Sequence, residues 1–178
     1  DDAVNYGAIG VTIGHEISHA FDDKGSQFDG DGNLRNWWTK EDRDNFDKRT
    51  GLLANQYSQY EVLPGRKLNG ELTLGENIAD LGGAKAAFRA YKISLKGEPS
   101  PIIDNYTGEQ RFFIGTAQSD RVKFRDEIYE MRVATSVHSP SRFRVDGVII
   151  NMKEFHKAFS TEKGDKLYKS DNDIILIW

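Results

Sequence analysis

The chain has 178 residues, a net charge of −4 and a sequence pI near 5.6. With 38% hydrophobic and 29% charged residues, its composition is that of a folded globular protein rather than a disordered or membrane-spanning one. The net negative charge argues against a dedicated nucleic-acid binder, and no segment approaches the roughly eighteen consecutive apolar residues of a transmembrane helix. Cysteine is absent, which excludes disulfides and thiolate metal sites and leaves the compartment open between the cytoplasm and export.

Periodicity and capping residues predict a mainly helical fold with little strand, in one domain spanning residues 1–178. The predicted helices, in chain order, cover Ala3–Phe21, Thr39–Tyr60, Thr73–Lys96, Thr107–Val137 and Met152–Phe159. The first of them is apolar almost throughout, so we expect it to be buried.

The segments between these helices carry turn and loop signals. Loops rich in Gly, Asp, Asn or Pro are predicted at residues 22–38, 97–105 and 138–147. Turns at Pro64-Gly65 and Asn69-Gly70 bracket a short extended piece, and the chain ends in an apolar stretch, Ile174 to Trp178. The chain begins with neither an initiating Met nor a signal peptide, and we expect it to be the C-terminal part of a longer protein.

The most informative motif lies in the first predicted helix, where His15, Glu16 and His19 follow an apolar run. Residues four apart share one helix face, so His15 and His19 can hold a metal ion together. Glu16 lies about 100° around the helix from His15 and about 60° from His19, where its carboxylate can reach a water bound to that metal. A metal ion also accounts for two imidazoles and a carboxylate in an apolar helix, because their unpaired burial is costly. The motif predicts a zinc peptidase with Glu16 as the base.

A catalytic zinc ion needs a third protein ligand and keeps its fourth position open for water. We expect Glu76 to be that ligand, and Asp80, on the same helical face, to accept the free N–H of a ligand imidazole. The alternative is a capping box between Thr73 and Glu76, which would place Glu76 on a backbone amide. Gly82 and Gly83, shortly after Asp80, would let a second helix approach closely. The spacing leaves both interpretations of Glu76 open.

Three motifs follow one another in the order His15-Glu16-x-x-His19-Ala20-Phe21-Asp22-Asp23, Glu76-Asn77-x-Ala79-Asp80-x-Gly82-Gly83 and His138-Ser139-Pro140-x-x-Phe143-Arg144-Val145. Together they resemble the neprilysin family of zinc metallopeptidases, and the resemblance extends to the terminal Trp178. It implies a mainly α, thermolysin-like (gluzincin) catalytic domain fragment, a helical bundle around one zinc ion per chain. Vertebrate members have a cysteine near the C-terminus, so its absence favours the bacterial branch.

The resemblance implies zinc ligation by His15, His19 and Glu76, and it adds two roles that spacing does not reveal. His138 corresponds to the family's hydrogen-bond donor to the transition state, and Arg144 to its anchor for a substrate carbonyl. Both roles are physically sensible, because a cationic or N–H donor near zinc stabilises the developing oxyanion. Without the resemblance, His138 would be interpreted as a loop residue and Arg144 as a surface charge.

The predicted function is hydrolysis of peptide bonds in short peptides, on the amino side of hydrophobic residues, as the family does. Family members place a substrate-binding Asn-Ala pair and a large helical domain N-terminal to the zinc helix, and we expect both to lie outside this sequence. The alternative is a zinc-binding domain that is inactive by itself because the upstream strand is missing. A helical domain without metal would leave the ligand set unexplained. Exposed apolar patches are expected where the missing part would pack.

Three further features are interpreted as structural. The segment Asp29-Gly30-Asp31-Gly32-Asn33 is predicted to be a tight polar turn rather than a calcium loop. An EF-hand loop starting at Asp29 would need Gly and Glu where this sequence has Leu34 and Lys40. His156 is predicted to be an exposed structural residue, and Trp37-Trp38 are predicted to pack rather than bind.

Overall fold

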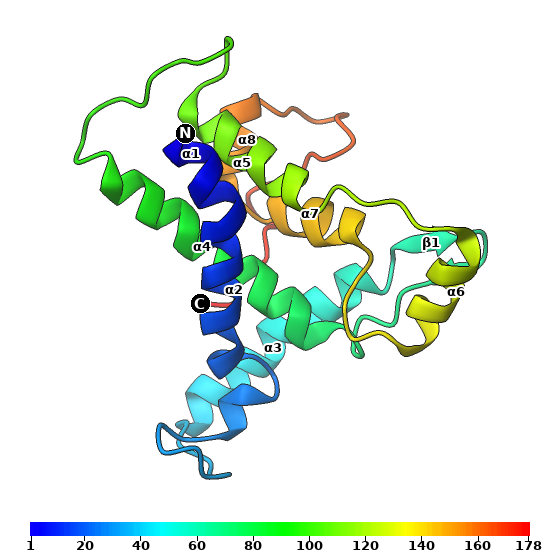
Figure 1. The fold of residues 1–178 in the computed structure, drawn as a ribbon. Helices are drawn as coiled ribbons and strands as arrows, with labels where there is room; N and C mark the ends of the chain where they lie inside the picture. Colours follow the sequence, from blue (N-terminus) through cyan, green and yellow to red (C-terminus); the bar gives the residue numbers. More distant parts are fainter.

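The computed structural model describes all residues, 1–178, and is mainly helical, as predicted (Figure 1). The helices are α1 (Asp2–Asn5), α2 (Val11–Ser18), α3 (Lys40–Tyr57), α4 (Leu74–Ser94), α5 (Gly108–Ser119), α6 (Asp126–Thr135), α7 (Ser141–Ile149) and α8 (Lys153–Phe159). The only sheet is an antiparallel hairpin of β1 (Glu61–Leu63) and β2 (Arg66–Lys67). None of the helices combines the length and apolar character needed to cross a membrane.

The N-terminal helical segment is nearly continuous, in agreement with the predicted helix. α1 passes through a π-helical stretch, Tyr6–Gly10, into α2, and a 3₁₀ turn, His19–Phe21, ends the segment. The side of this segment that packs on the core is lined by glycine. A Cβ at Gly7 would lie 2.0 Å from the carbonyl oxygen of Phe112 in α5. The backbones therefore approach more closely than any other residue type would permit.

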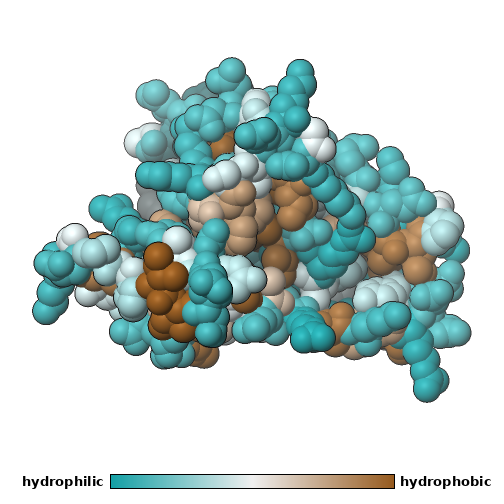
Figure 2. All heavy atoms as spheres, turned by 90° about the horizontal axis from the view of Figure 1, so that it is seen from above, coloured by the Kyte–Doolittle hydropathy of each residue, from teal (hydrophilic) through white to brown (hydrophobic).

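The expectation that this first helix is buried is wrong. Ile9, Ile13 and Ile17 are 60%, 55% and 63% exposed. They recur every four residues and so share one helical face, while the opposite face packs against α4 and α5. An all-apolar sequence does not tell which face meets the core. Other apolar patches interrupt the largely hydrophilic surface seen in Figure 2. Exposed apolar side chains are present, as the sequence analysis expects.

α4 is the central helix of the fold, and every residue from Asn77 to Ala84 is buried. α2 crosses it at two glycines: a Cβ at Gly83 would lie 2.4 Å from the backbone nitrogen of His15, and a Cβ at Gly14 2.8 Å from the carbonyl oxygen of Gly83. The close helix approach expected after Asp80 is therefore present. The hydrophobic core surrounds α4, with side chains from α3, α5, α7 and α8.

Two predicted boundaries are wrong. The helix predicted over Thr107–Val137 starts at the expected capping box, which Thr107 and Gln110 form, but it is two helices, α5 and α6. Between them the Phe124 ring folds onto α6, 5.7 Å from the ring of Tyr129 and 4.9 Å from the guanidinium of Arg132. Helical periodicity in the sequence does not record such a break.

The predicted loop over residues 138–147 contains the helix α7, which begins directly after Pro140. Proline fits immediately before or at the start of a helix, so its presence was no argument against one. Burial of Phe143, Val145 and Val148 against the core stabilises α7. Arg144 is consequently held on a helix instead of a loop.

The remaining elements lie within a few residues of their predicted bounds. The side chain of Thr39 caps α3 by accepting from the backbone N–H of Asp42 at 3.1 Å. Asp29 is a turn residue, as predicted: its Oδ1 accepts the backbone N–H of Asp31 and of Asn33, both at 3.0 Å. Trp38 packs against Phe46, with ring centroids 5.3 Å apart.

Candidate metal centre

Two imidazoles and one carboxylate converge where α2 meets α4. His15 lies in the last turn of α2, His19 opens the 3₁₀ turn that follows, and Glu76 lies in the first turn of α4. One nitrogen or oxygen atom of each side chain lies within 4.8 Å of the others. No other group of three or more His, Asp or Glu side chains in the chain comes this close together. The capping box that competed for Glu76 is not formed, since the Thr73 side chain makes no capping hydrogen bond.

Each imidazole is oriented by a carboxylate. His15 Nδ1 lies 2.7 Å from Asp80 Oδ1, and His19 Nδ1 lies 2.8 Å from Asp22 Oδ2. An ionised carboxylate only accepts hydrogen bonds, so Nδ1 carries a proton in both rings and Nε2 is the nitrogen left to bind a metal ion. The two Nε2 atoms face Glu76, at 3.3 Å from Oε2 for His15 and 3.8 Å from Oε1 for His19.

Asp22 received no role from the sequence, although it belongs to the first motif. It is buried, and its second oxygen, Oδ1, accepts the backbone N–H of Lys24 at 2.8 Å and of Gly25 at 2.6 Å. These bonds hold the carboxylate rigidly against His19. The signal that could have identified it is an Asp three residues after a ligand histidine, where the helix ends.

The side chains present fit a zinc ion. Glu76 Oε2 is buried and makes no hydrogen bond, although it lies 3.3 Å from His15 Nε2 and 3.2 Å from His138 Nε2. A deprotonated imidazole nitrogen and a carboxylate oxygen both offer lone pairs, so they repel unless a proton or a metal ion lies between them. Two imidazoles and one carboxylate, with room for a fourth ligand, are the donor set of a catalytic zinc site.

The electrostatics of the centre also favour a cation. Burial lowers the pKa of His15, but the nearby carboxylates of Asp80 and Glu76 outweigh burial and raise it from 6.5 to about 9. Burial raises the pKa of Glu76, whereas the contact with His15 and the charge of His138 bring it below its usual value. The pKa of Asp80 is likewise raised by burial and lowered further by Arg144 and His15. The carboxylates thus stay ionised and attract a positive charge to the imidazole nitrogens.

Arg144 reaches the centre from α7 through Asp80. Its Nε donates to Asp80 Oδ2 at 2.8 Å and its Nη2 to Oδ1 at 2.6 Å, which is a two-point pair. Asp80 therefore bridges His15 and Arg144. The third nitrogen of the guanidinium, Nη1, makes no hydrogen bond within the chain and is able to donate to a bound molecule.

The last two predicted residues, His138 and Glu16, are more exposed than the three candidate ligands. His138 places Nε2 3.2 Å from Glu76 Oε2, with its side chain 44% exposed. Glu16 is exposed on α2 and makes no hydrogen bond or ion pair. Its carboxylate is consequently free to accept a proton.

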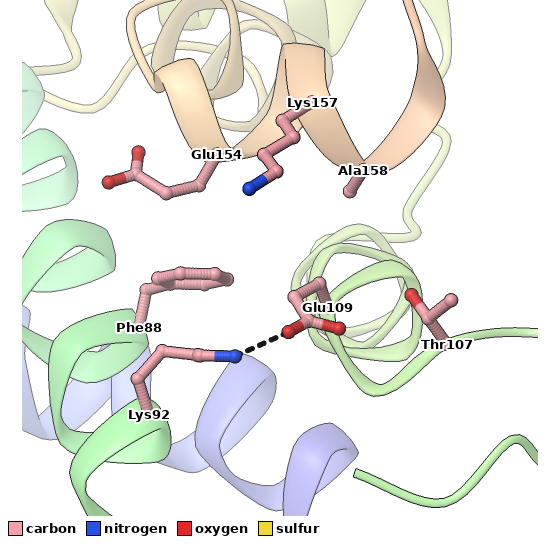
Figure 3. A pocket seen from close by; sticks show the side chains of 7 residues that line it. All are labelled: Phe88, Lys92, Thr107, Glu109, Glu154, Lys157 and Ala158. Carbon is pink, nitrogen blue, oxygen red and sulfur yellow. Dashed lines mark hydrogen bonds and ion pairs between the residues drawn. The ribbon is translucent and has the colours of Figure 1, made fainter. Parts of the chain in front are cut away.

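The remaining candidate features lie away from this centre. His156 is half-buried rather than exposed, since its Nε2 donates to the carbonyl oxygen of Ile150 at 3.0 Å and its Nδ1 accepts from the Thr161 hydroxyl at 2.7 Å. A cavity of about 440 Å³ opens between α4, α5 and α8 (Figure 3). Across it Lys92 pairs with Glu109 at 2.5 Å, and none of the predicted site residues lines it.

Comparisons with known proteins identify the family of the chain. The model of Peptidase family M13 matches residues 1–175. Neprilysin-11 of Caenorhabditis elegans is 48% identical over 162 residues, which are 88% of this chain and 19% of that protein. Human endothelin-converting enzyme 1 is 45% identical over 168 residues, 93% of this chain and 22% of that protein. The chain thus spans about a fifth of the length of these curated relatives.

Solved structures show the same fold. The crystal structure of the Mycobacterium tuberculosis zinc metalloprotease Zmp1 with an inhibitor has a TM-score of 0.97 and 46% identity, over 100% of this chain and 28% of that chain. PepO from Lactobacillus rhamnosis has a TM-score of 0.87 and 35% identity, over 100% of this chain and 27% of that chain. The resemblance to the neprilysin family is confirmed.

Proposed function

Because the chain belongs to peptidase family M13, we propose that it is the catalytic portion of a zinc-dependent endopeptidase that cleaves short peptides. The observation that carries the proposal is the convergence of His15, His19 and Glu76, with both imidazoles oriented so that Nε2 faces the carboxylate. The M13 relatives support peptide hydrolysis as the reaction. Cleavage on the amino side of a hydrophobic residue rests on the resemblance alone.

The side chains divide the chemistry between them. A zinc ion on His15, His19 and Glu76 would supply a Lewis acid that polarises the scissile carbonyl and lowers the pKa of a bound water to about 7. The Glu16 carboxylate accepts the proton of the attacking water and returns it to the leaving amine nitrogen.

Two further side chains act on the substrate. His138 Nε2 donates a hydrogen bond to the carbonyl oxygen as negative charge develops there. Arg144 Nη1 donates to a neighbouring carbonyl of the peptide, while its Nε and Nη2 stay on Asp80.

The test compares the parent chain with Glu16→Gln, using a fluorescence-quenched octapeptide with phenylalanine at its centre. Glu16→Gln should keep zinc and lose about 10²- to 10⁴-fold in turnover, because the substitution removes the base and not a ligand. Glu98→Gln, at an exposed loop position, is the matched control and should keep the parent rate. Full activity in Glu16→Gln would contradict the assignment of the base.

A second candidate function is a zinc-binding domain that is inactive by itself. The exposed apolar face formed by Ile9, Ile13 and Ile17 favours it, since such a face is typical of a surface that packs against another part of a protein. Zinc in the parent chain without turnover of the octapeptide would support this alternative. Turnover that Glu16→Gln abolishes would exclude it.

A further inference from the structure

His138 differs from the other residues of the centre because little of the chain packs around it. Its side chain is 44% exposed, and its imidazole contacts only Glu76 within the centre. α6, which precedes it, has no buried residue. The chain on the N-terminal side of His138 therefore does not fix the imidazole in place.

The contact that ties this segment to α4 lies on the C-terminal side of His138, at the next residue. Ser139 is 1% exposed, and its hydroxyl donates to Oδ1 of Asn77 at 2.8 Å. Asn77 is 0% exposed and directly follows Glu76 in α4. One short hydrogen bond thus ties the backbone beside His138 to the turn of α4 that carries Glu76.

The partner of Ser139 is itself fixed. Asn77 Nδ2 donates to the hydroxyl of Thr73 at 3.0 Å, which sets the orientation of the amide and turns Oδ1 towards Ser139. Buried polar groups are almost always hydrogen-bonded. Here the Ser139 hydroxyl and the Asn77 amide oxygen, 62 residues apart in the sequence, are hydrogen-bonded to each other. The other hydrogen bonds near His138 involve Ser136, which belongs to the same loop and cannot fix the loop to α4.

We propose that Asn77 and Ser139 are positioning residues, whose hydrogen bond holds the His138 imidazole against Glu76 and so places it for the oxyanion. The catalytic half of this statement rests on the proposed peptidase function. A displacement of about 1 Å in a catalytic group can reduce turnover by up to about 10²-fold. A hydrogen bond that merely stabilised the fold would have no such effect on turnover.

The first experiment is a double-mutant cycle between Ser139→Ala and His138→Ala in the zinc-loaded chain, with kcat and KM measured on the octapeptide. Ser139→Ala should lower kcat by about tenfold, change KM by less than about twofold and keep the zinc content. In the His138→Ala background it should have no further effect, because Ser139 acts only through His138. An equal loss of kcat in both backgrounds would overturn the proposal.

The matched control is Thr50→Val, which also removes a buried hydroxyl. Thr50 is 4% exposed in α3, and its hydroxyl donates to the carbonyl oxygen of Phe46 at 3.0 Å, away from the centre. The Thr50→Val substitution should leave kcat unchanged. Ser139→Cys keeps the volume and a weaker donor, so it should lower kcat less than Ser139→Ala does.

The second experiment does not depend on activity. A nuclear Overhauser contact between the His138 ring and the Glu76 side chain should be present in the parent and in Thr50→Val, and be lost in Ser139→Ala. Persistence of this contact in Ser139→Ala would overturn the proposal. An inactive parent whose contact is lost in Ser139→Ala would contradict the proposed function and leave the positioning role standing.

Discussion

The crossing of α2 and α4 and the segment around α6 both lead to the candidate site, but they hold their residues differently. At the crossing, Gly14 and Gly83 bring two backbones into direct contact, and His15 and Glu76 project from rigid helices. α6 has no buried residue, and the segment after it is tied to α4 through Ser139. The candidate ligands His15 and Glu76 are thus fixed by backbone packing, whereas the residue after His138 is tied to α4 by a side-chain hydrogen bond.

The largest effect on stability is expected from adding a side chain at Gly83, where α2 and α4 cross. A Cβ at Gly83 would lie 2.4 Å from the backbone nitrogen of His15 and 2.8 Å from the carbonyl oxygen of Val11, and neither backbone atom can move without moving the helix. Gly83→Ala should therefore lower the free energy of unfolding by about 3 kcal/mol, with loss of metal binding. Urea denaturation measures the stability. Gly51→Ala in α3, where a Cβ would meet nothing within 4 Å, is the control and should gain about 0.5–1 kcal/mol.

A smaller effect is expected from the carboxylate that links the two helices to α7. Asp80→Asn removes the negative charge shared by His15 and Arg144 and leaves one neutral acceptor oxygen for the two donors. Zinc affinity, measured by competition with a chromophoric chelator, should fall about 10- to 100-fold. Asp171→Asn, in an exposed pair with Lys153, should leave the affinity at the parent value. Unchanged affinity in Asp80→Asn would show that the His15 ring needs no support from α4.

The smallest effect is expected in α6. Ile128 is 38% exposed, whereas Ile78 in α4 is 0% exposed. Ile128→Ala should change the free energy of unfolding by less than about 0.5 kcal/mol, and Ile78→Ala should lower it by about 2–5 kcal/mol. Urea denaturation of the two variants measures both. Comparable losses would mean that α6 is as much a part of the core as α4 is.

The same contrast explains what the sequence could predict. The i, i+4 histidines and the Glu76 to Asp80 spacing are local patterns on single helices, so the ligand set could be proposed without a structure. The presence of α7 depends on the packing of Phe143 in the core, which no local pattern records, and the break between α5 and α6 leaves no mark in the helical periodicity. Asp22 and Ser139 belonged to recognised motifs, but their partners, His19 and Asn77, become evident only from hydrogen-bond geometry.

The helix exposure was mispredicted for a related reason. The sequence from Ala3 to Phe21 is apolar almost throughout, and its few polar side chains are interpreted as a metal site and not as a face towards solvent. The glycines at the crossing decide the orientation instead, because only their side of the helix can approach α4. Ile9, Ile13 and Ile17 are exposed as a consequence.

The central claim is that His15, His19 and Glu76 together hold a zinc ion. The most direct measurement is zinc content per chain, by native mass spectrometry, for the parent and for Glu76→Ala. One zinc ion in the parent and a clear loss in Glu76→Ala are the predicted result, since Glu76 supplies the only carboxylate that faces both imidazole nitrogens. An equal zinc content in both chains would contradict the account and place the third ligand elsewhere.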